Sequence, residues 1–157
     1  MTQTIEQNNF TSQFFEILDE VFVTHHGILL DKNNSLFETL ATIDAATASL
    51  PVGGKCASLA AQVKHVNFYI EVLEKYIFGP PPTNVDWGEI WRMVEKVSEA
   101  EWDAYRAELK TTYERVSNRL RTMPSWDNQD IIGGAMAIMV HTAYHLGEIR
   151  QALCTLR

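Results

Sequence analysis

Cysteine and proline are scarce in this chain: it has 2 cysteines and 5 prolines among 157 residues. Cys56 and Cys154 stand far apart, so no disulfide framework is indicated, and we expect reduced thiols, as in cytoplasmic proteins. Because neither thiol has a histidine or another cysteine near it in sequence, neither is a strong candidate nucleophile. We expect both to be buried or half-buried.

Positive charge and long hydrophobic runs are also missing. The 13 lysines and arginines are outnumbered by 20 acidic residues, which gives a net charge of −7, and no basic cluster interrupts this balance. Such a surface repels phosphate backbones, so nucleic-acid binding is not expected. The longest nearly apolar run, Ile131–Val140, is too short to cross a bilayer, and the first ten residues lack the features of a signal peptide. We therefore expect a cytoplasmic protein without a membrane partner.

Apolar residues are plentiful, at 46% of the chain, and they can fill the core of one domain over residues 1–157. They recur every three or four residues nearly throughout, which is typical of helices, and no alternating run is bounded by hairpin turns. Four helices of about 20 residues, each about 30 Å long, fit this length. The sequence therefore predicts an all-α fold, a four-helix bundle with one additional short helix.

Capping and breaking residues indicate where these helices begin and end. The first should run from Phe10 to His25–Gly27, where imidazoles meet the last carbonyls and glycine permits a left-handed turn. A capping-box spacing opens a second segment, Ser35–Ala48, which a loop at Pro51–Lys55 follows. The remaining helices are predicted over residues 57–78, 86–91, 98–122 and from the break at 124–128 to 156. The last of them begins apolar on nearly every side, as expected of an enclosed helix.

Three of the five histidines lie within predicted helices. His141 and His145 are four residues apart, so they project from one helical face and can share a metal ion. His65 lies in the middle of the third helix, and if the two helices face each other, three imidazoles converge. The alternative is that these are core histidines hydrogen-bonded to a backbone carbonyl or to a tyrosine, such as Tyr69 or Tyr144. For the two histidines at the end of the first helix, charge–dipole contact is a sufficient explanation.

Two known metal schemes are absent from this pattern. Thr142 follows His141 where zinc proteases have a glutamate base, and no glutamate stands three residues before any histidine, as di-iron bundles require. What remains is a mononuclear site of three neutral nitrogens, which leaves at least one position open for water or substrate, as catalytic sites do. Three histidines accept zinc, nickel, copper, iron or cobalt, so the pattern does not choose the metal.

The same residues carry a resemblance to a known family. His-Thr-Ala-Tyr-His-Leu-Gly-Glu-Ile-Arg-Gln, at 141–151, resembles His-x-x-x-His-x-Gly-x-Ile-Arg-Gln, the last-helix signature of the DinB/YfiT-like superfamily of proposed metalloenzymes. Residues 58–66, Ser-Leu-Ala-Ala-Gln-Val-Lys-His-Val, are similar to the family's second-core-helix motif, which contains the third histidine. The tryptophans within 85–91 and at 126 resemble those of one bacterial branch, so the resemblance covers essentially the whole chain.

The resemblance implies an up-down-down-up four-helix bundle, often a homodimer, in which His65, His141 and His145 bind a divalent metal such as nickel or zinc. Several members of the family act as thiol-dependent S-transferases or hydrolases and use low-molecular-weight thiols such as bacillithiol or mycothiol, whereas most have no assigned reaction. The implied partners are therefore a small-molecule substrate, a low-molecular-weight thiol and a second copy of the chain.

Other side chains near the histidines are weaker candidates. Glu148, on the face of the histidine pair, accepts a proton from a ligand histidine, acts as a general base, or is a solvated or salt-bridged carboxylate, which we favour. Tyr69, which could offer a hydroxyl to a bound ligand, and Tyr144 are expected to pack. Gly147 should allow close helix packing, and Arg150 should serve scaffold or subunit contacts. The tryptophans are expected in the core or an interface rather than at a pocket mouth: Trp87, Trp91, Trp102 and Trp126.

Three hypotheses remain open. The chain is a metal-dependent enzyme of thiol-transfer or hydrolytic type, a non-catalytic metal-binding dimer with a binding or stress-related role, or a metal-free bundle with core histidines. A pocket that opens onto the metal favours the first hypothesis, and a fourth protein ligand favours the second. The third requires His65 to lie far from the other two histidines.

Overall fold

The computed structural model describes residues 5–54 and 56–156, so residues 1–4, Lys55 of the predicted loop and Arg157 lie outside it. The described part is helical and has no β-strand, which confirms the predicted all-α class. A 3₁₀ turn, Val52–Gly54, lies in the loop before α4. The α-helices are, in chain order, α1 (Gln7–Phe22), α2 (Leu36–Leu40), α3 (Ala45–Ala48), α4 (Leu59–Phe78), α5 (Glu89–Met93), α6 (Glu99–Arg121) and α7 (Gln129–Leu156).

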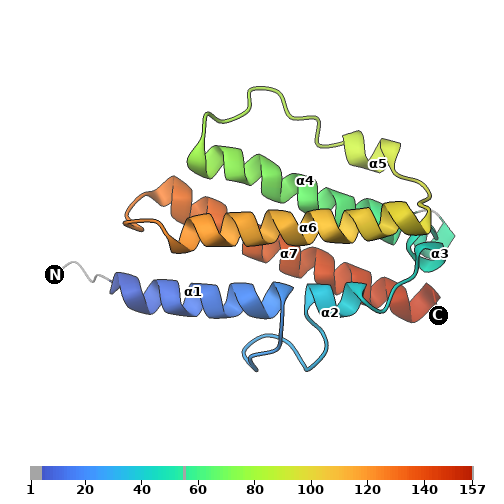
Figure 1. The fold of residues 1–157 in the computed structure, drawn as a ribbon, viewed down its shortest axis with the longest axis horizontal. Coiled ribbons are helices and arrows are strands. Elements are labelled where there is room, and N and C mark those ends of the chain that lie inside the picture. Colours follow the sequence, from blue (N-terminus) through green and yellow to red (C-terminus); the bar gives the residue numbers. More distant parts are fainter. Residues whose placement is uncertain (1–4, 55, 157) are drawn as a thin grey trace.

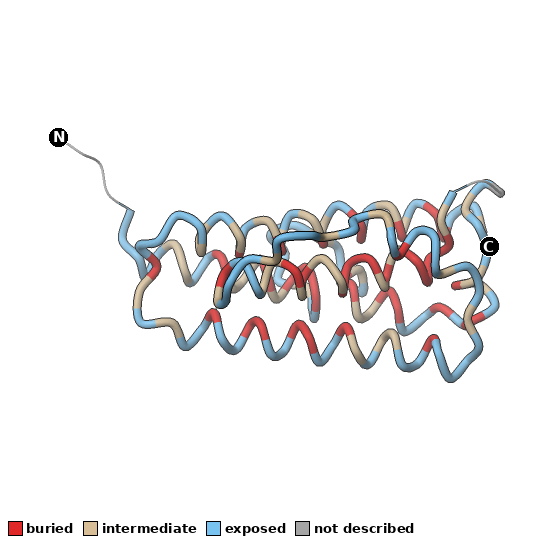
Figure 2. Tube along the Cα trace, turned by 90° about the horizontal axis from the view of Figure 1, so that it is seen from above, coloured by how far each residue is buried: buried red, intermediate tan, exposed pale blue. Residues whose placement is uncertain are grey.

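Four long helices, α1, α4, α6 and α7, lie along the long axis of the molecule (Figure 1). α1 and α7 run in one direction, and α4 and α6 run in the other. α4 packs against both α7 and α6, and α7 also packs against α1. Their buried residues face the interior (Figure 2), where one apolar cluster draws on all four helices, through Phe22, Val66, Leu109 and Ile149 among others.

Local capping explains where α4 and α6 begin. The Ser58 hydroxyl accepts a hydrogen bond from the Ala61 N–H at 3.2 Å, and α4 then continues to its end before Gly79. The Glu101 carboxylate accepts from the Ser98 N–H at 2.8 Å, which closes the predicted capping box of α6. Both helices match their predicted bounds to within two residues, because their end signals are local.

The first helix ends earlier than predicted. α1 stops at Phe22, so His25 and His26 lie beyond the helix. The His26 side chain instead contacts the Asp19 carboxylate, with Nε2 2.7 Å from Oδ2. Gly27 does take the predicted left-handed conformation, with φ at 83°. The helix end predicted at residues 25–27 was therefore wrong, whereas the turn at Gly27 was placed correctly.

The second segment is two short helices instead of one. The capping box at Ser35 forms as predicted, since Glu38 accepts from the Ser35 N–H and hydroxyl, and it starts α2. Asp44 then begins α3, because its carboxylate accepts from the Thr47 N–H at 2.7 Å. A side chain that caps a new helix offers the backbone an alternative to continuing the old one. The single helix predicted over 35–48 therefore breaks.

The last helix is not enclosed on all sides, contrary to the expectation from its apolar sequence. Residues such as Ala135 and Ile138 are buried against the other helices. Met136, Val140 and Tyr144, on another face of α7, are 42%, 59% and 62% exposed. No helix within the described ranges combines the length and apolarity needed to cross a membrane.

Close helix packing occurs at Gly134 and not at Gly147. A Cβ at Gly134 would lie 2.6 Å from Ile77 Cγ1 of α4, whereas one at Gly147 would have no neighbour within 4 Å. Gly134 therefore lets the backbones of α4 and α7 approach each other. The close-packing role predicted for Gly147 therefore belongs to Gly134.

A buried carboxylate holds the loop between α1 and α2. Glu20 is fully buried and accepts hydrogen bonds from five consecutive backbone N–H groups, those of residues 26–30, at 2.9–3.2 Å. Burial by itself raises the pKa of this carboxyl group, but the N–H groups outweigh it and lower the pKa from 4.5 to about 2. The Glu20 carboxylate thus accepts the hydrogen bonds that backbone carbonyls would accept from these loop amides in regular secondary structure.

Glu20→Gln should lower the free energy of unfolding by about 2–4 kcal/mol at pH 7, because it leaves buried N–H groups without their charged acceptor. The pKa of Glu20 is lower in the folded state, so the ionised carboxylate stabilises the fold above pH 4.5, and this contribution is lost as the pH falls towards about 2. Urea unfolding at pH 7 and at pH 3 should therefore show a smaller difference between wild type and variant at the acid pH.

The matched control is Glu16→Gln on the same helix. Glu16 is half-buried and accepts a hydrogen bond from the exposed Gln13 amide at 3.2 Å but binds none of the loop amides that Glu20 holds, so its loss should cost less than about 0.5 kcal/mol. Equal losses in the two variants would contradict the role given to Glu20.

Candidate metal centre

The three histidines singled out in the sequence come together between two packed helices. His65 lies seven residues after Ser58, whose side chain caps α4, and His141 and His145 lie near the middle of α7. The Nε2 atoms of His65 and His141 are 3.2 Å apart. One ring nitrogen from each of the three residues lies within 4.8 Å of the others, which is close enough to hold a metal ion. We refer to these three residues as the histidine triad.

The donor set fits a first-row divalent metal. Metal–nitrogen bonds of about 2.0–2.1 Å at tetrahedral angles put two ligand nitrogens about 3.3–3.4 Å apart. The observed separation of 3.2 Å between the Nε2 atoms of His65 and His141 is close to that value. Among the described residues, no other histidine, cysteine, aspartate or glutamate joins the group. The triad therefore supplies three nitrogens and leaves at least one coordination position without a protein ligand.

Burial keeps the triad neutral, which is the form that binds metal. Burial, with the nearby charge of His145 as a smaller cause, lowers the pKa of His65 to about 4. Burial and the other two imidazoles lower the pKa of His141 to about 3. The pKa of His145 is also lowered by burial, although Glu148 opposes the shift. At neutral pH each ring therefore keeps one nitrogen whose lone pair is free to bind a metal.

Aromatic rings surround the triad. The Trp91 ring, on α5, lies 4.4 Å from the His65 ring between centroids, and the Tyr69 ring stacks on His141 at 3.5 Å with planes 7° apart. Tyr69 thus packs as expected, but on an imidazole of the opposite helix. The position of Trp91 corrects the expectation of a core or interface anchor for this residue. In the sequence, Trp91 is marked only by its spacing of four residues from Trp87 in a predicted short helix. This spacing does not indicate which residues the two tryptophans contact.

Glu148 orients one member of the triad. Its Oε2 lies 2.8 Å from Nδ1 of His145, and the Tyr144 hydroxyl is hydrogen-bonded to the same carboxylate, which raises the pKa of Tyr144. A carboxylate at the outer nitrogen fixes the tautomer of a ligand histidine and directs its other nitrogen at the metal. This ion-pair contact of a partly exposed carboxylate fits the favoured interpretation, a solvated or salt-bridged Glu148, and its partner is a triad histidine, as the alternative requires. Tyr144 is mostly exposed, but its ring packs edge-on against the His145 ring, with the centroids 5.2 Å apart.

Two hollows border the residues around the triad. Trp91 and Cys56 line one of about 470 Å³, and Tyr144, Glu148 and Cys56 line another of about 530 Å³. Cys56 and Cys154 are both exposed, so the expectation of buried or half-buried thiols was wrong. Cys56 is the residue that both hollows share. His141 is only half-buried, so the triad is not sealed from solvent.

The remaining tryptophans divide between core and surface. Trp102 is fully buried and donates its indole N–H to the Ile43 carbonyl at 2.7 Å, and Trp126 packs against three phenylalanines of α1. These two match the predicted core role. Trp87 is partly exposed and packs against Tyr69, so it supports the aromatic wall of the triad from outside.

Comparison of the chain with protein-family models, with curated proteins and with solved structures found no match.

The protein should bind about one divalent transition metal per chain, and His65→Ala, His141→Ala and His145→Ala should each abolish this binding, because two imidazoles hold a metal far less tightly than three. Most of the helicity should remain, since the core is apolar. Elemental analysis and far-ultraviolet circular dichroism of protein purified without a histidine tag measure the two effects.

His25→Ala and His26→Ala are the matched controls, because both remove an imidazole that lies outside the triad. They should keep the full metal content. Unchanged metal in the triad variants would overturn the site, and complete unfolding of those variants would show that the ion is needed for folding.

Proposed function

We propose that the protein is a metal-dependent enzyme of thiol-transfer or hydrolytic type, with His65, His141 and His145 as the ligands of one divalent ion, nickel or zinc. The observation that carries this proposal is the convergence of three neutral imidazoles from α4 and α7, with no fourth protein ligand among the described residues. An incomplete ligand set is the mark of a catalytic metal site, whereas structural sites are closed by four protein ligands.

The geometry also bears on the other two hypotheses. A metal-free bundle required His65 to lie far from the histidine pair, yet its Nε2 is 3.2 Å from that of His141. A non-catalytic metal site was expected to show a fourth ligand. The carboxylate that approaches the triad, Glu148, lies at the outer nitrogen of His145 and so supports a ligand instead of adding one. Both observations favour the enzyme.

The resemblance to the DinB/YfiT-like superfamily supports the same function, and we propose membership on that basis. The two motifs that carry the resemblance, at 58–66 and 141–151, hold the three residues that converge. We also propose that the four long helices form the up-down-down-up bundle of that family, since α1 and α7 run against α4 and α6 (Figure 1). The cytoplasmic location and the homodimer stay predictions.

The residues of the chain would divide the chemistry among them. When bound, a zinc- or nickel-type ion supplies Lewis acidity, which lowers the pKa of a water or thiol at its open position. Glu148, whose Oε2 lies 2.8 Å from Nδ1 of His145, would hold the proton on that atom and leave the Nε2 lone pair of the ring for the ion. Tyr69 and Trp91 each cover one face of an imidazole, that of His141 and that of His65, and so limit the access of water to these faces.

Turnover tests the enzyme proposal. The zinc- or nickel-loaded protein should hydrolyse an activated ester such as 4-nitrophenyl acetate, or should join a small thiol to 1-chloro-2,4-dinitrobenzene. In the second reaction the S–C bond forms, chloride leaves with the electron pair, and the thiol proton passes to solvent. We expect a rate that falls at least about 100-fold in His145→Ala and is unchanged in His26→Ala. Stoichiometric metal without turnover in either assay would favour the non-catalytic metal-binding protein.

Glu148→Gln should weaken metal binding about tenfold, because an amide holds the Nδ1 proton of His145 less strongly than a carboxylate does. Competition with a chromogenic chelator measures the affinity at pH 7.5. Glu114→Gln on α6 is the control, since Glu114 is an exposed carboxylate that lies 4.0 Å from Lys110, and it should leave the affinity unchanged. A variant at 148 that binds metal as tightly as wild type would reduce Glu148 to a surface charge.

A further inference from the structure

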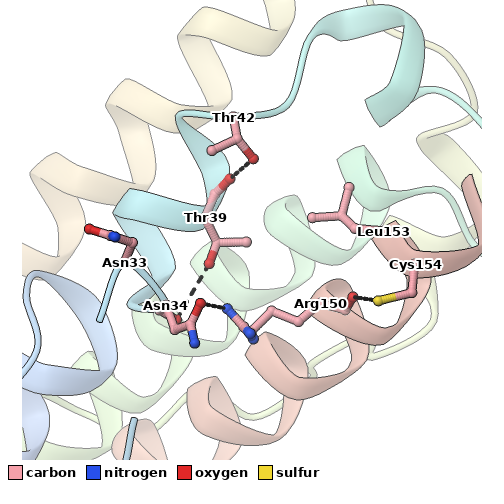
Figure 3. A pocket seen from close by; sticks show the side chains of 7 residues that line it. All are labelled: Asn33, Asn34, Thr39, Thr42, Arg150, Leu153 and Cys154. Carbon is pink, nitrogen blue, oxygen red and sulfur yellow. Dashed lines mark hydrogen bonds between the residues drawn. The ribbon is translucent and has the colours of Figure 1, made fainter. Parts of the chain in front are cut away.

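A further hollow, away from the triad, contains an arginine whose neighbours in the lining, among the described residues, are all uncharged. It measures about 350 Å³ and lies between the loop before α2, α2 itself and the last turns of α7 (Figure 3). Its lining residues are Asn33, Asn34, Thr39, Thr42, Arg150, Leu153 and Cys154. We call it the Arg150 hollow.

Arg150 differs from most arginines of the chain in its partner. Its guanidinium donates to the Asn34 Oδ1 amide oxygen, which is a neutral acceptor. Four other arginines form ion pairs with carboxylates, namely Arg92, Arg106, Arg115 and Arg119. A guanidinium has five N–H donors, so the contact with Asn34 leaves most of them available. The positive charge at Arg150 is therefore not neutralised by any ion pair among the described residues.

The lining of the hollow suits an anion in a chain that is acidic overall. No aspartate or glutamate lines the Arg150 hollow. Each of the other four described hollows has at least one, for example Glu95 near Trp91 or Glu148 near the triad. With a net charge of −7, most of the surface repels anions. The Arg150 hollow is thus the one place among the five that attracts a negative group and lacks a carboxylate to compete for it.

The asparagine side of the hollow is positioned before any ligand binds. The loop that carries it is held at one end by Glu20, which binds the amides of residues 26–30. The Ser35 hydroxyl holds the other end by donating to the Val23 carbonyl at 2.9 Å. Between these anchors Asn33 adopts a left-handed conformation, with φ at 62°, which is uncommon for any residue but glycine. A fixed loop lowers the entropy lost on binding.

We propose that the Arg150 hollow binds the oxyanion group of a small molecule, a carboxylate or a phosphate. The planar guanidinium of Arg150 offers two parallel N–H donors to such a group, and the side-chain amide of Asn34, whose oxygen contacts Arg150, adds a neutral donor beside it through its nitrogen. The site is separate from the metal centre. Arg150 follows His145 by five residues, which places it about 140° further round the helix.

Titration of the isotope-labelled full-length chain with inorganic phosphate and with acetate tests the proposal by NMR. We expect saturable shifts confined to the signals of Asn33, Asn34, Arg150 and their neighbours, with the tighter of the two anions indicating which class of ligand the hollow takes. Arg150→Gln should weaken the binding at least tenfold. Repetition in His145→Ala, which removes a metal ligand, should give the same affinity, so failure of the metal proposal would leave this result untouched.

Arg121→Gln is the matched control. Arg121 also lacks a carboxylate partner within ion-pair distance, but Glu16 and Asp19 line its hollow, so its loss should leave anion binding unchanged. Asn34→Asp places a negative charge in the Arg150 hollow without altering α7, and it should abolish binding even if Arg150→Gln does not fold. Shifts that persist in Asn34→Asp, or an absence of saturable shifts in the wild type, would overturn the proposal.

Discussion

The packing of α4 against α7 is the contact on which the metal centre depends. No loop or covalent bond fixes the distance between His65 and the histidine pair, because the residues are 76 positions apart in the chain. That distance is set by apolar side chains between the two helices and by Gly134, where the backbones approach. One residue of axial slip moves a side chain by about 1.5 Å, which is far more than a metal–nitrogen bond tolerates. The close packing of the core therefore sets the spacing between His65 and the histidine pair.

The triad is costly to the fold when no cation is present. Burial lowers the pKa of all three imidazoles, so each ring is neutral at pH 7. These polar rings lose the hydration that they would have in the unfolded chain. Two Nε2 atoms 3.2 Å apart can share only one proton in a hydrogen bond. Apolar side chains at the same positions would pack without this cost. A few residues that lower the stability of the fold, within a core that is otherwise apolar and well packed, are typical of a functional site.

Local patterns predicted most of this structure, and the failures have a common cause. The caps at Ser58 and Ser98, and the i,i+4 histidines, depend on residues within one helical turn, so the sequence alone was enough. The end of α1 was missed because it depends on Glu20 binding amides six to ten residues later. The contact of Trp91 with His65 joins two elements across the fold, and no spacing rule reports it. The pairing of Glu148 with His145 was among the alternatives because it lies within one turn.

The faces of α7 have different neighbours. Its sequence therefore indicated the histidine pair correctly but led to the wrong expectation of an enclosed helix. At 100° per residue, its histidines, its buried residues, Arg150 and its exposed apolar residues occupy successive arcs of one helix. A helix that is apolar on several sides is expected to be enclosed, but here the arc with Val140 and Tyr144 faces outward. The buried arc lies between the histidines and Arg150, so the same packing that holds the triad in place also separates it from the positively charged hollow. Each arc therefore has a different neighbour, and hydrophobicity alone does not distinguish them.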